Sequence, residues 1–393
     1  MLNRKYKSWI IVLVVITMLG SLLTGCGGQN SKVSTKEKEP LKIGFIGPLT
    51  GVNAKGGKSM KQGMELALEE INAAGGVNGH ELQAIYEDDE YNATKGKAVA
   101  EKLVSKDEVD IVIGSYSSAS VMSFMDVTKK AKVPLIVPVA VGKAITESGN
   151  DWLFRNCATN NMQITQEMEY LLKNPDFKKY AVISENTDFG KEVAEIITKM
   201  VTDKGLELVA VESYSPGDTD FYSQLTKIGQ QKPDVLFLGS NLTEVSQLVR
   251  QAREIGVTAQ FAGTGAPSSP EFDKLVDGAN EGMMCTSYFE SATTNQLAID
   301  FIKAYKAKYN EDADMFGAAT YEAAYIAKEA MMKAGDEISD KVVWRTAVRD
   351  ALKSFKDVPG VQGPTTFNEK GQAFKKIFIV QWKNHEKVVL QGQ

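Results

Sequence analysis

A run of hydroxyl side chains that follows a short apolar stretch is the part of this sequence best suited to chemistry. Asp110–Gly114 is rich in β-branched residues and predicts a strand that is buried on both faces. Ser115–Ser120 predicts a polar turn, and a helix is predicted from Val121, with Ser117 or Ser118 as its N-cap. A helix N-terminus with nearby hydroxyls favours an anion. The stretch alone leaves open that the serines only cap a helix.

Residues for catalysis or metal binding are scarce. The two histidines, His80 and His385, stand in polar, turn-like contexts, and no Gly-x-Ser-x-Gly motif occurs in the sequence. We therefore expect no enzyme activity, no cofactor and no metal site, although Asp88–Glu90 keeps a cation site open as an alternative. The stretch Gly51–Ser59 resembles a P-loop but has five residues, not four, before its Gly-Lys-Ser. It predicts a flexible glycine-rich turn that lines a cleft.

The N-terminus has the pattern of a secretory signal. Three basic residues precede an apolar run from Ile10 to Leu23, which ends in Leu-Thr-Gly-Cys26. This ending resembles the bacterial lipobox, which implies that residues 1–25 are removed and that Cys26 is lipidated; an ordinary signal with an incidental cysteine is the alternative. Residues 26–40 predict a hydrophilic tether. Removing residues 1–25 changes the net charge from −5 to about −8, and no basic patch indicates nucleic-acid binding.

From Leu41 onward, strands and helices alternate with short connections. Strands are predicted over Leu41–Gly47, Glu81–Glu87, Asp110–Gly114 and Val133–Val137, and helices over Ser59–Ala74, Ala93–Ser105 and from Val121. A second series predicts strands over Tyr180–Ser184, Leu206–Ser213, Asp234–Leu238 and Gln260–Ala262, and helices over Gln163–Leu172, Lys191–Asp203, Phe221–Gly229 and Thr243–Ile255. This alternation predicts an α/β fold of two doubly wound parallel-sheet lobes.

The last part of the chain differs from these two series. It predicts three helices with no clear strand between them, followed by an antiparallel ending: Gln296–Tyr309, Phe316–Lys333, Lys341–Phe355, then Lys376–Trp382 and Val388–Leu390. Two cysteines, Cys157 and Cys285, follow the predicted lipid anchor Cys26. We expect two buried thiols, although a single bridge stays open.

Polar groups recur where the predicted strands end. They are Ser117 and Ser118, Val139–Val141, Asn186–Phe189, Ser240–Asn241 and Thr264–Gly265. Such ends meet in the crevice of a parallel sheet, so two lobes that face one another should enclose a polar ligand cleft.

Several short sequence words, in this order, resemble the Leu/Ile/Val-binding branch of the type I periplasmic binding proteins. They are Leu41-Lys-Ile-Gly-Phe-Ile-Gly-Pro-Leu-Thr-Gly, Glu70-Ile-Asn-Ala-Ala-Gly-Gly-Val-Asn-Gly, Tyr86-Glu-Asp-Asp, Val112-Ile-Gly, Asp188-Phe-Gly and Leu248-Val-Arg-Gln-Ala-Arg. The resemblance implies two lobes joined by a three-crossover hinge, with crossovers near Thr159, Thr286 and Gly360. Lobe 1 would comprise residues 41–159 and 287–360, and lobe 2 residues 160–286 and 361–393.

The resemblance also implies a binding site and a transport role. Ser118 with groups at Val139 and Val141 would hold a ligand carboxylate, and the other lobe would close with Phe189, Asn241 and Gly265, while Asn160 stands near the hinge. Tyr116 and Ser117 are further candidate ligand-binding residues. Lipidated members of the family deliver solutes to an ABC permease. A small-molecule ligand, a permease partner, anchoring to the membrane through Cys26 and a monomeric state are therefore expected.

Several positions depart from the amino-acid binders of this family. Val141 stands where the carboxylate-binding threonine is usual, Gly265 where an acid pairs with the ligand ammonium, and Asn160 where the crossover acid is usual. The tyrosines expected near Gly56 and Asn241 are also missing. Asp188 or Glu290 would be candidates for a displaced acid. We expect an extracytoplasmic solute-binding lipoprotein for a small amino-acid-like or carboxylate solute. A sensor that reports to a membrane receptor and a cell-wall enzyme are the alternatives.

Overall fold

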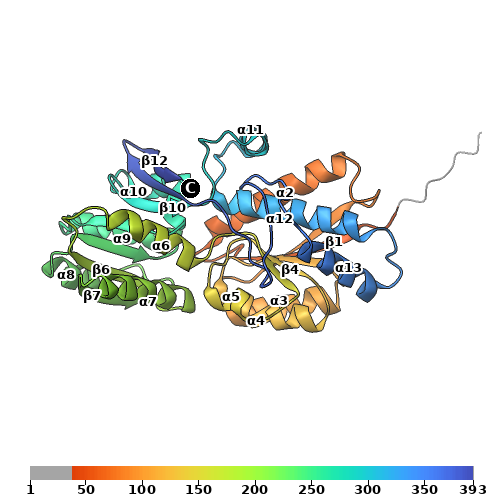
Figure 1. The fold of residues 1–393 in the computed structure, drawn as a ribbon, viewed down its shortest axis with the longest axis horizontal. Helices are drawn as coiled ribbons and strands as arrows, with labels where there is room; N and C mark the ends of the chain where they lie inside the picture. The colour runs from red at the N-terminus through yellow and green to blue at the C-terminus, as the bar shows by residue number, and fades with distance from the viewer. Residues whose placement is uncertain (1–37, 393) are drawn as a thin grey trace, which may run out of the picture. The chain divides into compact units, whose positions relative to one another are not determined.

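Two sheets organise the protein, each at the centre of one lobe (Figure 1). The structure is a computed structural model that describes residues 38–392, and the chain from Glu39 onward forms a compact unit by itself. The lobe 1 sheet has the order β2-β1-β3-β4-β5, with every pair parallel. Its strands are β1 (Leu41–Gly47), β2 (Leu82–Asp88), β3 (Ile111–Gly114), β4 (Leu135–Val137) and β5 (Leu153–Arg155).

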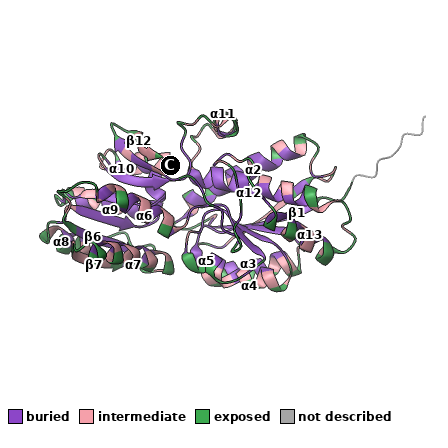
Figure 2. Cartoon of the chain, in the orientation of Figure 1, coloured by how far each residue is buried: buried purple, intermediate pink, exposed green. Residues whose placement is uncertain are grey.

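Helices cover both faces of the lobe 1 sheet. Ile111 and Ile113 of β3 pack in one apolar core together with residues of α2 and α12, whereas Val112 packs in another with residues of α3 and α4. This alternation confirms the prediction that Asp110–Gly114 forms a strand with two buried faces, and Figure 2 shows both interiors as buried. The helices of this lobe are α2 (Ala54–Ala73), α3 (Ala93–Ser105), α4 (Ser118–Lys130), α5 (Lys143–Glu147), α11 (Gln296–Tyr309), α12 (Met315–Ala334) and α13 (Lys341–Lys353).

The lobe 2 sheet is mixed, with the order β12-β11-β10-β9-β8-β6-β7. Its last two strands pair antiparallel, as the sequence predicts, and the others are parallel. The strands are β6 (Lys179–Glu185), β7 (Glu207–Tyr214), β8 (Val235–Gly239), β9 (Gln260–Gly263), β10 (Met284–Ser287), β11 (Phe378–Lys383) and β12 (Glu386–Gly392). The helices are α6 (Asn160–Leu171), α7 (Asp188–Asp203), α8 (Tyr222–Gln230), α9 (Leu242–Glu254) and α10 (Pro270–Val276), with a 3-10 turn, η1, over Ala266–Ser268.

The structure contains short elements that the sequence does not predict. They are strands β5 and β10 and helices α5 and α10, each of three to seven residues. A run this short covers at most two turns of helix or two repeats of a strand, so it has no readable period. Helix α2 begins at Ala54, five residues before its predicted start, and α4 begins at Ser118 instead of Val121.

The chain passes between the sheets after β5 and after β10. The segment Val358–Ala373 follows α13 and stays with lobe 1, because the Arg155 N–H donates to the Gly371 carbonyl at 2.7 Å and the Ala373 N–H to the Arg155 carbonyl at 2.9 Å. Gly360, near which the sequence predicts the third crossover, lies within this segment. We propose that the third passage lies at residues 374–377, whereas the assignment of the remaining lobe boundaries stays a prediction.

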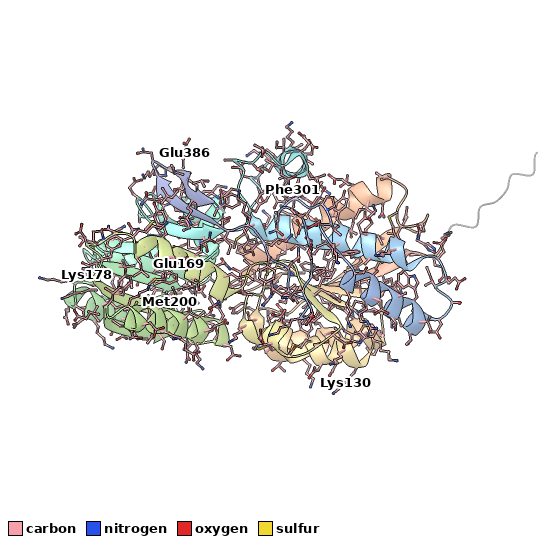
Figure 3. All side chains as sticks on the ribbon, in the orientation of Figure 1. Lys130, Glu169, Lys178, Met200, Phe301 and Glu386 are labelled. Atoms are coloured by element: carbon pink, nitrogen blue, oxygen red, sulfur yellow. The ribbon has the colours of Figure 1, made fainter. Side chains whose placement is uncertain are left out.

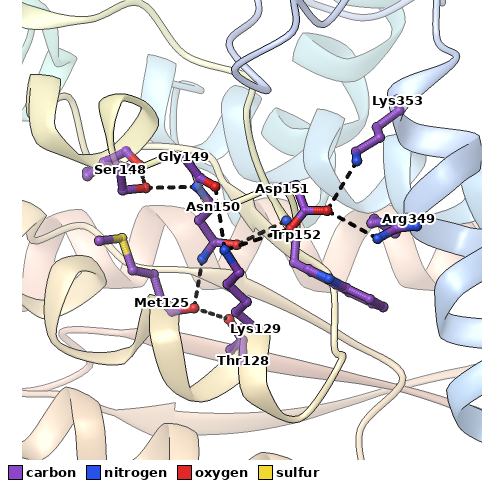
Figure 4. A network of polar contacts seen from close by, with 11 residues as sticks. Met125, Thr128, Lys129, Ser148, Gly149, Asn150, Asp151, Trp152, Arg349 and Lys353 are labelled. Carbon is purple, nitrogen blue, oxygen red and sulfur yellow. Dashed lines mark hydrogen bonds and ion pairs between the residues drawn. The ribbon is translucent and has the colours of Figure 1, made fainter.

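The loop before β5 is fixed by polar contacts to α4 and α13 (Figure 4). Asn150 Nδ2 donates to the Met125 carbonyl at 2.9 Å, and Asn150 Oδ1 accepts the Trp152 N–H at 3.0 Å. Asp151 pairs with Arg349 and Lys353 of α13 at 3.2 and 3.3 Å. These contacts hold the short edge strand β5 in register, which in turn positions the chain that enters lobe 2.

The thiols and the outer surface follow the expectations from composition. Cys157 and Cys285 are free and buried, which confirms the prediction of two buried thiols. Charged side chains such as Lys130 and Lys178 lie at the periphery (Figure 3). Among residues 38–392, no helix is both long and apolar enough to span a bilayer. The predicted signal peptide, Cys26 and most of the tether lie outside the described residues.

Candidate ligand-binding site

A small cavity of ≈ 40 Å³ lies between the lobes, at the carboxyl ends of their parallel strands. Lobe 1 and lobe 2 both contribute to its wall, which is formed by Tyr91, Tyr116, Ser118, Val139, Val141, Gln163, Phe189, Ser240, Asn241, Thr264, Gly265, Ala266, Tyr288, Met315 and Phe316. A larger hollow of ≈ 790 Å³ lies on lobe 2 beside Asp234 and Gln260. It is at the amino ends of β8 and β9, where ligands of α/β sheets do not usually bind.

Most of the residues singled out from the sequence line this one cavity. They are Tyr116, Ser118, Val139, Val141, Phe189 and Asn241, together with Gly265. Two do not line it. Ser117 is the N-cap of α4, since its Oγ accepts the Ser120 N–H at 3.2 Å, as the sequence predicts. Asn160 is buried and donates to Glu192 Oε2 at 3.4 Å. Whether these residues bind a ligand stays a prediction.

The polar turn Ser115–Ser120 is held in place by the buried carboxylate of Asp89. Asp89 Oδ2 accepts hydrogen bonds from the hydroxyls of Ser115 and Ser120, both at 2.5 Å, and burial raises the pKa of Asp89 while these bonds lower it. Ser118 Oγ accepts the Gly142 N–H at 3.1 Å. These bonds join the turn to the end of β2 and to the chain after β4, so the hydroxyls and the N-terminus of α4 are fixed before any ligand arrives.

From Ala54 onward the glycine-rich stretch belongs to helix α2, so the prediction of a flexible turn is wrong for residues 54–58. A Cβ at Gly56 would lie 2.5 Å from Cε2 of Tyr116, and a Cβ at Gly57 would lie 1.9 Å from the Pro48 carbonyl oxygen. Both glycines are therefore needed for close packing. Gly56 makes room for the ring of Tyr116, which reaches the cavity wall from behind.

The cavity wall is aromatic and uncharged. Five aromatic side chains line it, and Tyr116 packs against Phe316 and Tyr91, with ring centroids 5.1 and 6.1 Å apart. No lysine, arginine, histidine, aspartate or glutamate is among the lining residues. A ligand carboxylate would therefore be stabilised by hydroxyls, backbone amides and the α4 dipole and not by a basic side chain.

Neither acid suggested by the sequence lines the cavity. Asp188 is exposed in the first turn of α7, and Glu290 is paired with Lys387 at 2.9 Å. An acid that does lie beside the wall is Glu185, at the end of β6. It contacts Tyr91 and Asn241, at 3.2 and 2.8 Å. The sequence gives no sign of it, because Glu185 precedes a polar turn and resembles a solvated strand end.

Comparison with known proteins agrees with this geometry. The family model of the periplasmic binding proteins matches residues 40–387. A leucine-, isoleucine-, valine-, threonine- and alanine-binding protein of Pseudomonas aeruginosa is 31% identical over 88% of this chain and 90% of its own length. The Leu/Ile/Val-binding protein of Escherichia coli is 25% identical over 85% of this chain and 88% of its own length.

Solved structures share the fold over nearly their whole length. The branched-chain amino acid transporter substrate-binding protein LivJ of Streptococcus pneumoniae, in complex with isoleucine, has a TM-score of 0.82 at 27% identity and covers 90% of this chain and 99% of its own. A solute-binding protein of an ABC transporter from R. palustris, in complex with benzoate, also has a TM-score of 0.82, at 20% identity, with coverage of 90% and 96%. Its likeness concerns the fold alone. The chain therefore belongs to the type I periplasmic binding proteins of the Leu/Ile/Val-binding family.

Proposed function

We propose that this chain is an extracytoplasmic solute-binding lipoprotein that captures a small amino-acid-like or carboxylate solute between its lobes and delivers it to an ABC permease. The observation that carries the proposal is the cavity lined by strand ends of both lobes. Members of its family are binding proteins, and the relatives named above bind amino acids or, in one case, benzoate.

The contacts between the lobes support a mechanism in which ligand binding and closure are coupled. The Thr243 hydroxyl of lobe 2 donates to the Val52 carbonyl of lobe 1 at 2.7 Å, and Lys55 pairs with Glu271 at 2.5 Å. Asn241 Nδ2 donates to the Tyr91 hydroxyl at 2.8 Å. A ligand that contacts both walls stabilises the closed state over an open one, which shifts the population of the two states.

A panel of ligands tests the binding function. Thermal unfolding of residues 30–393 would be followed with branched-chain and small amino acids, their 2-oxo acids and benzoate. A ligand at 100 times its Kd adds about 2.7 kcal/mol to the free energy of unfolding of the protein. The melting temperature of the protein should therefore rise measurably. No shift with any member of the panel would contradict the proposed ligand class.

The anchoring is tested separately. In cells, Cys26→Ser should move the protein from the membrane fraction to the medium or the periplasm, because the thiol that accepts the lipid is removed. Retention of the Cys26→Ser protein in the membrane fraction would contradict a lipid anchor at Cys26.

A further inference from the structure

Glu185 places a buried carboxylate directly behind the polar side of the cavity wall. It is fully buried, and its Oε2 accepts from the Tyr91 hydroxyl at 3.2 Å and from Asn241 Nδ2 at 2.8 Å. Both donors line the cavity. Its Oε1 is also buried and has no hydrogen-bond partner. A buried carboxylate oxygen without a partner is costly, so this atom is suited to accept a donor that the ligand brings.

A second buried acid lies close enough to act on the first. Glu244, in the first turn of α9, has one oxygen bonded to the Gly217 N–H at 3.2 Å and the other without a partner. Burial and the charge of Glu244 raise the pKa of Glu185 to about 8. The other titratable groups that face Glu185 are the hydroxyls of Tyr91, Tyr116 and Tyr214. None of the ion pairs among residues 38–392 gives either glutamate a cation.

Gly265, where the family resemblance implies an acid, has a backbone and surroundings that disfavour a side chain. A Cβ on Gly265 would lie 2.6 Å from Cε of Met315, and φ at Gly265 is +57°. A carboxylate at this point would require Met315 to move. A carboxylate that this chain does hold beside the cavity is Glu185, at the end of β6, which is separated by β8 from strand β9 that precedes Gly265.

We propose that Glu185, held by Tyr91 and Asn241, recognises the ammonium group of an α-amino acid whose carboxylate lies at Ser118 and the N-terminus of α4. The inference rests on the proposed function and narrows it: the ligand is a zwitterion, not a carboxylate without an amino group. The charged ammonium supplies the cation that the two buried glutamates lack, and the charged form of Glu185 is favoured when it is bound. Phe189 and Phe316 provide apolar contacts for the ligand side chain.

Paired ligands test this inference directly. Leucine, isoleucine, valine and alanine would be titrated by calorimetry into residues 30–393, each beside the 2-oxo acid that keeps its carboxylate and side chain. At least one amino acid should bind about 30-fold more tightly than its oxo acid, since leaving a buried charge without its partner weakens a complex by that factor or more. Glu185→Gln should remove most of this discrimination.

Glu167→Gln is the matched control. Glu167 is also fully buried in lobe 2, accepts one backbone N–H, from Gly263, at 3.3 Å and has a second oxygen without a partner, but its donor Gly263 does not line the cavity, whereas both donors to Glu185 do. The Glu167→Gln protein should keep the wild-type ratio between the affinity for an amino acid and the affinity for its 2-oxo acid. Proton release gives an independent readout on the wild type: an amino acid should expel a proton from Glu185 at pH 7, and an oxo acid should not. This measurement does not depend on whether Glu185→Gln folds.

The outcomes separate the inference from the proposed function. Oxo acids or benzoate that bind as tightly as amino acids, or a Glu185→Gln protein that still discriminates as the wild type does, would overturn the role of Glu185 and leave solute binding standing. Binding of no amino acid, oxo acid or benzoate would overturn both.

Discussion

Asp89 and Glu185 are both buried carboxylates near the cavity, but their partners differ. Asp89 accepts two serine hydroxyls and the Tyr91 N–H, which compensates for the loss of water around its charge. Glu185 has one oxygen bonded and one without a partner. The first residue is therefore suited to fix a turn, whereas the second favours its protonated form until a cation arrives.

Stability should depend on pH through Glu185. Its pKa is about 8 in the folded protein and near 4.5 when unfolded, so between these values the folded state holds a proton that the unfolded state has lost. The free energy of unfolding then falls as pH rises, by at most about 1.4 kcal/mol per pH unit. Glu185→Gln should remove this contribution. Urea unfolding at pH 5 to 8 measures it, with the exposed Glu195→Gln as the control, and an unchanged slope in Glu185→Gln would contradict the assignment.

Ser117 and Ser118 are adjacent, but replacing Ser117 should affect the stability of the protein, whereas replacing Ser118 should affect its affinity for the ligand. Ser117→Ala removes the cap of α4 and should cost about 1 kcal/mol of stability with little change in affinity. Ser118→Ala removes a hydroxyl from the cavity wall and should weaken binding of an anionic ligand by about 10-fold or more. Urea unfolding and calorimetric titration of both variants check this. Wild-type affinity in Ser118→Ala would argue against a carboxylate site at the α4 N-terminus.

The residues of the site differ in how readily the sequence reveals them. Ser117, Ser118 and Val141 follow strands directly, so local pattern is sufficient to place them near a strand end. Glu185 is different, because its partners Tyr91 and Asn241 are 94 and 56 residues away in the chain. Its bonded partners come from both lobes, a combination that no local pattern contains.

At the scale of the elements, helices α2 and α12 pack closely against each other at two glycines, Gly63 and Gly317. A Cβ at Gly63 would lie 2.1 Å from the Gly317 carbonyl oxygen. This crossing positions the N-terminal ends of both helices. Met315 and Phe316 of α12 line the cavity, and Gly56 of α2 makes room for the ring of Tyr116. The sequence predicts that both helices exist. It does not predict that they cross at these glycines, since that contact joins segments over 250 residues apart.

Gly63→Ala should therefore destabilise the protein by about 1–3 kcal/mol, because the opposing atom is backbone and cannot rotate away. Gly229→Ala in α8 is the matched control: its Cβ would meet only Cγ2 of Val257, at 3.3 Å, and helix propensity favours alanine by up to about 1 kcal/mol. Urea unfolding of both variants measures the difference. Equal stability of the two variants would show that the helices separate easily at this crossing.

At the scale of the whole molecule, closure uses contacts that no ligand needs to touch. Glu192 of α7 in lobe 2 accepts the backbone N–H of Lys143 in lobe 1 at 3.0 Å, and Asn160 Nδ2 at 3.4 Å. Its side chain is not part of the cavity wall. A contact of this kind contributes to the equilibrium between open and closed states and so to the apparent affinity for every ligand alike.

Glu192→Ala should weaken binding of all ligands by one common factor, on the order of 10-fold, because a hydrogen bond to a charged group contributes about 1.5–3 kcal/mol and part of it is recovered from water. Glu195→Ala, one turn along the same helix and exposed, should leave the affinities unchanged.

Comparing the affinities of two variants for both ligand classes distinguishes an effect on lobe closure from an effect on ligand recognition. Glu185→Gln should change the ratio between an amino acid and its oxo acid, whereas Glu192→Ala should lower both affinities and keep their ratio. A Glu192→Ala protein that loses affinity for one ligand class only would place Glu192 in the binding site itself.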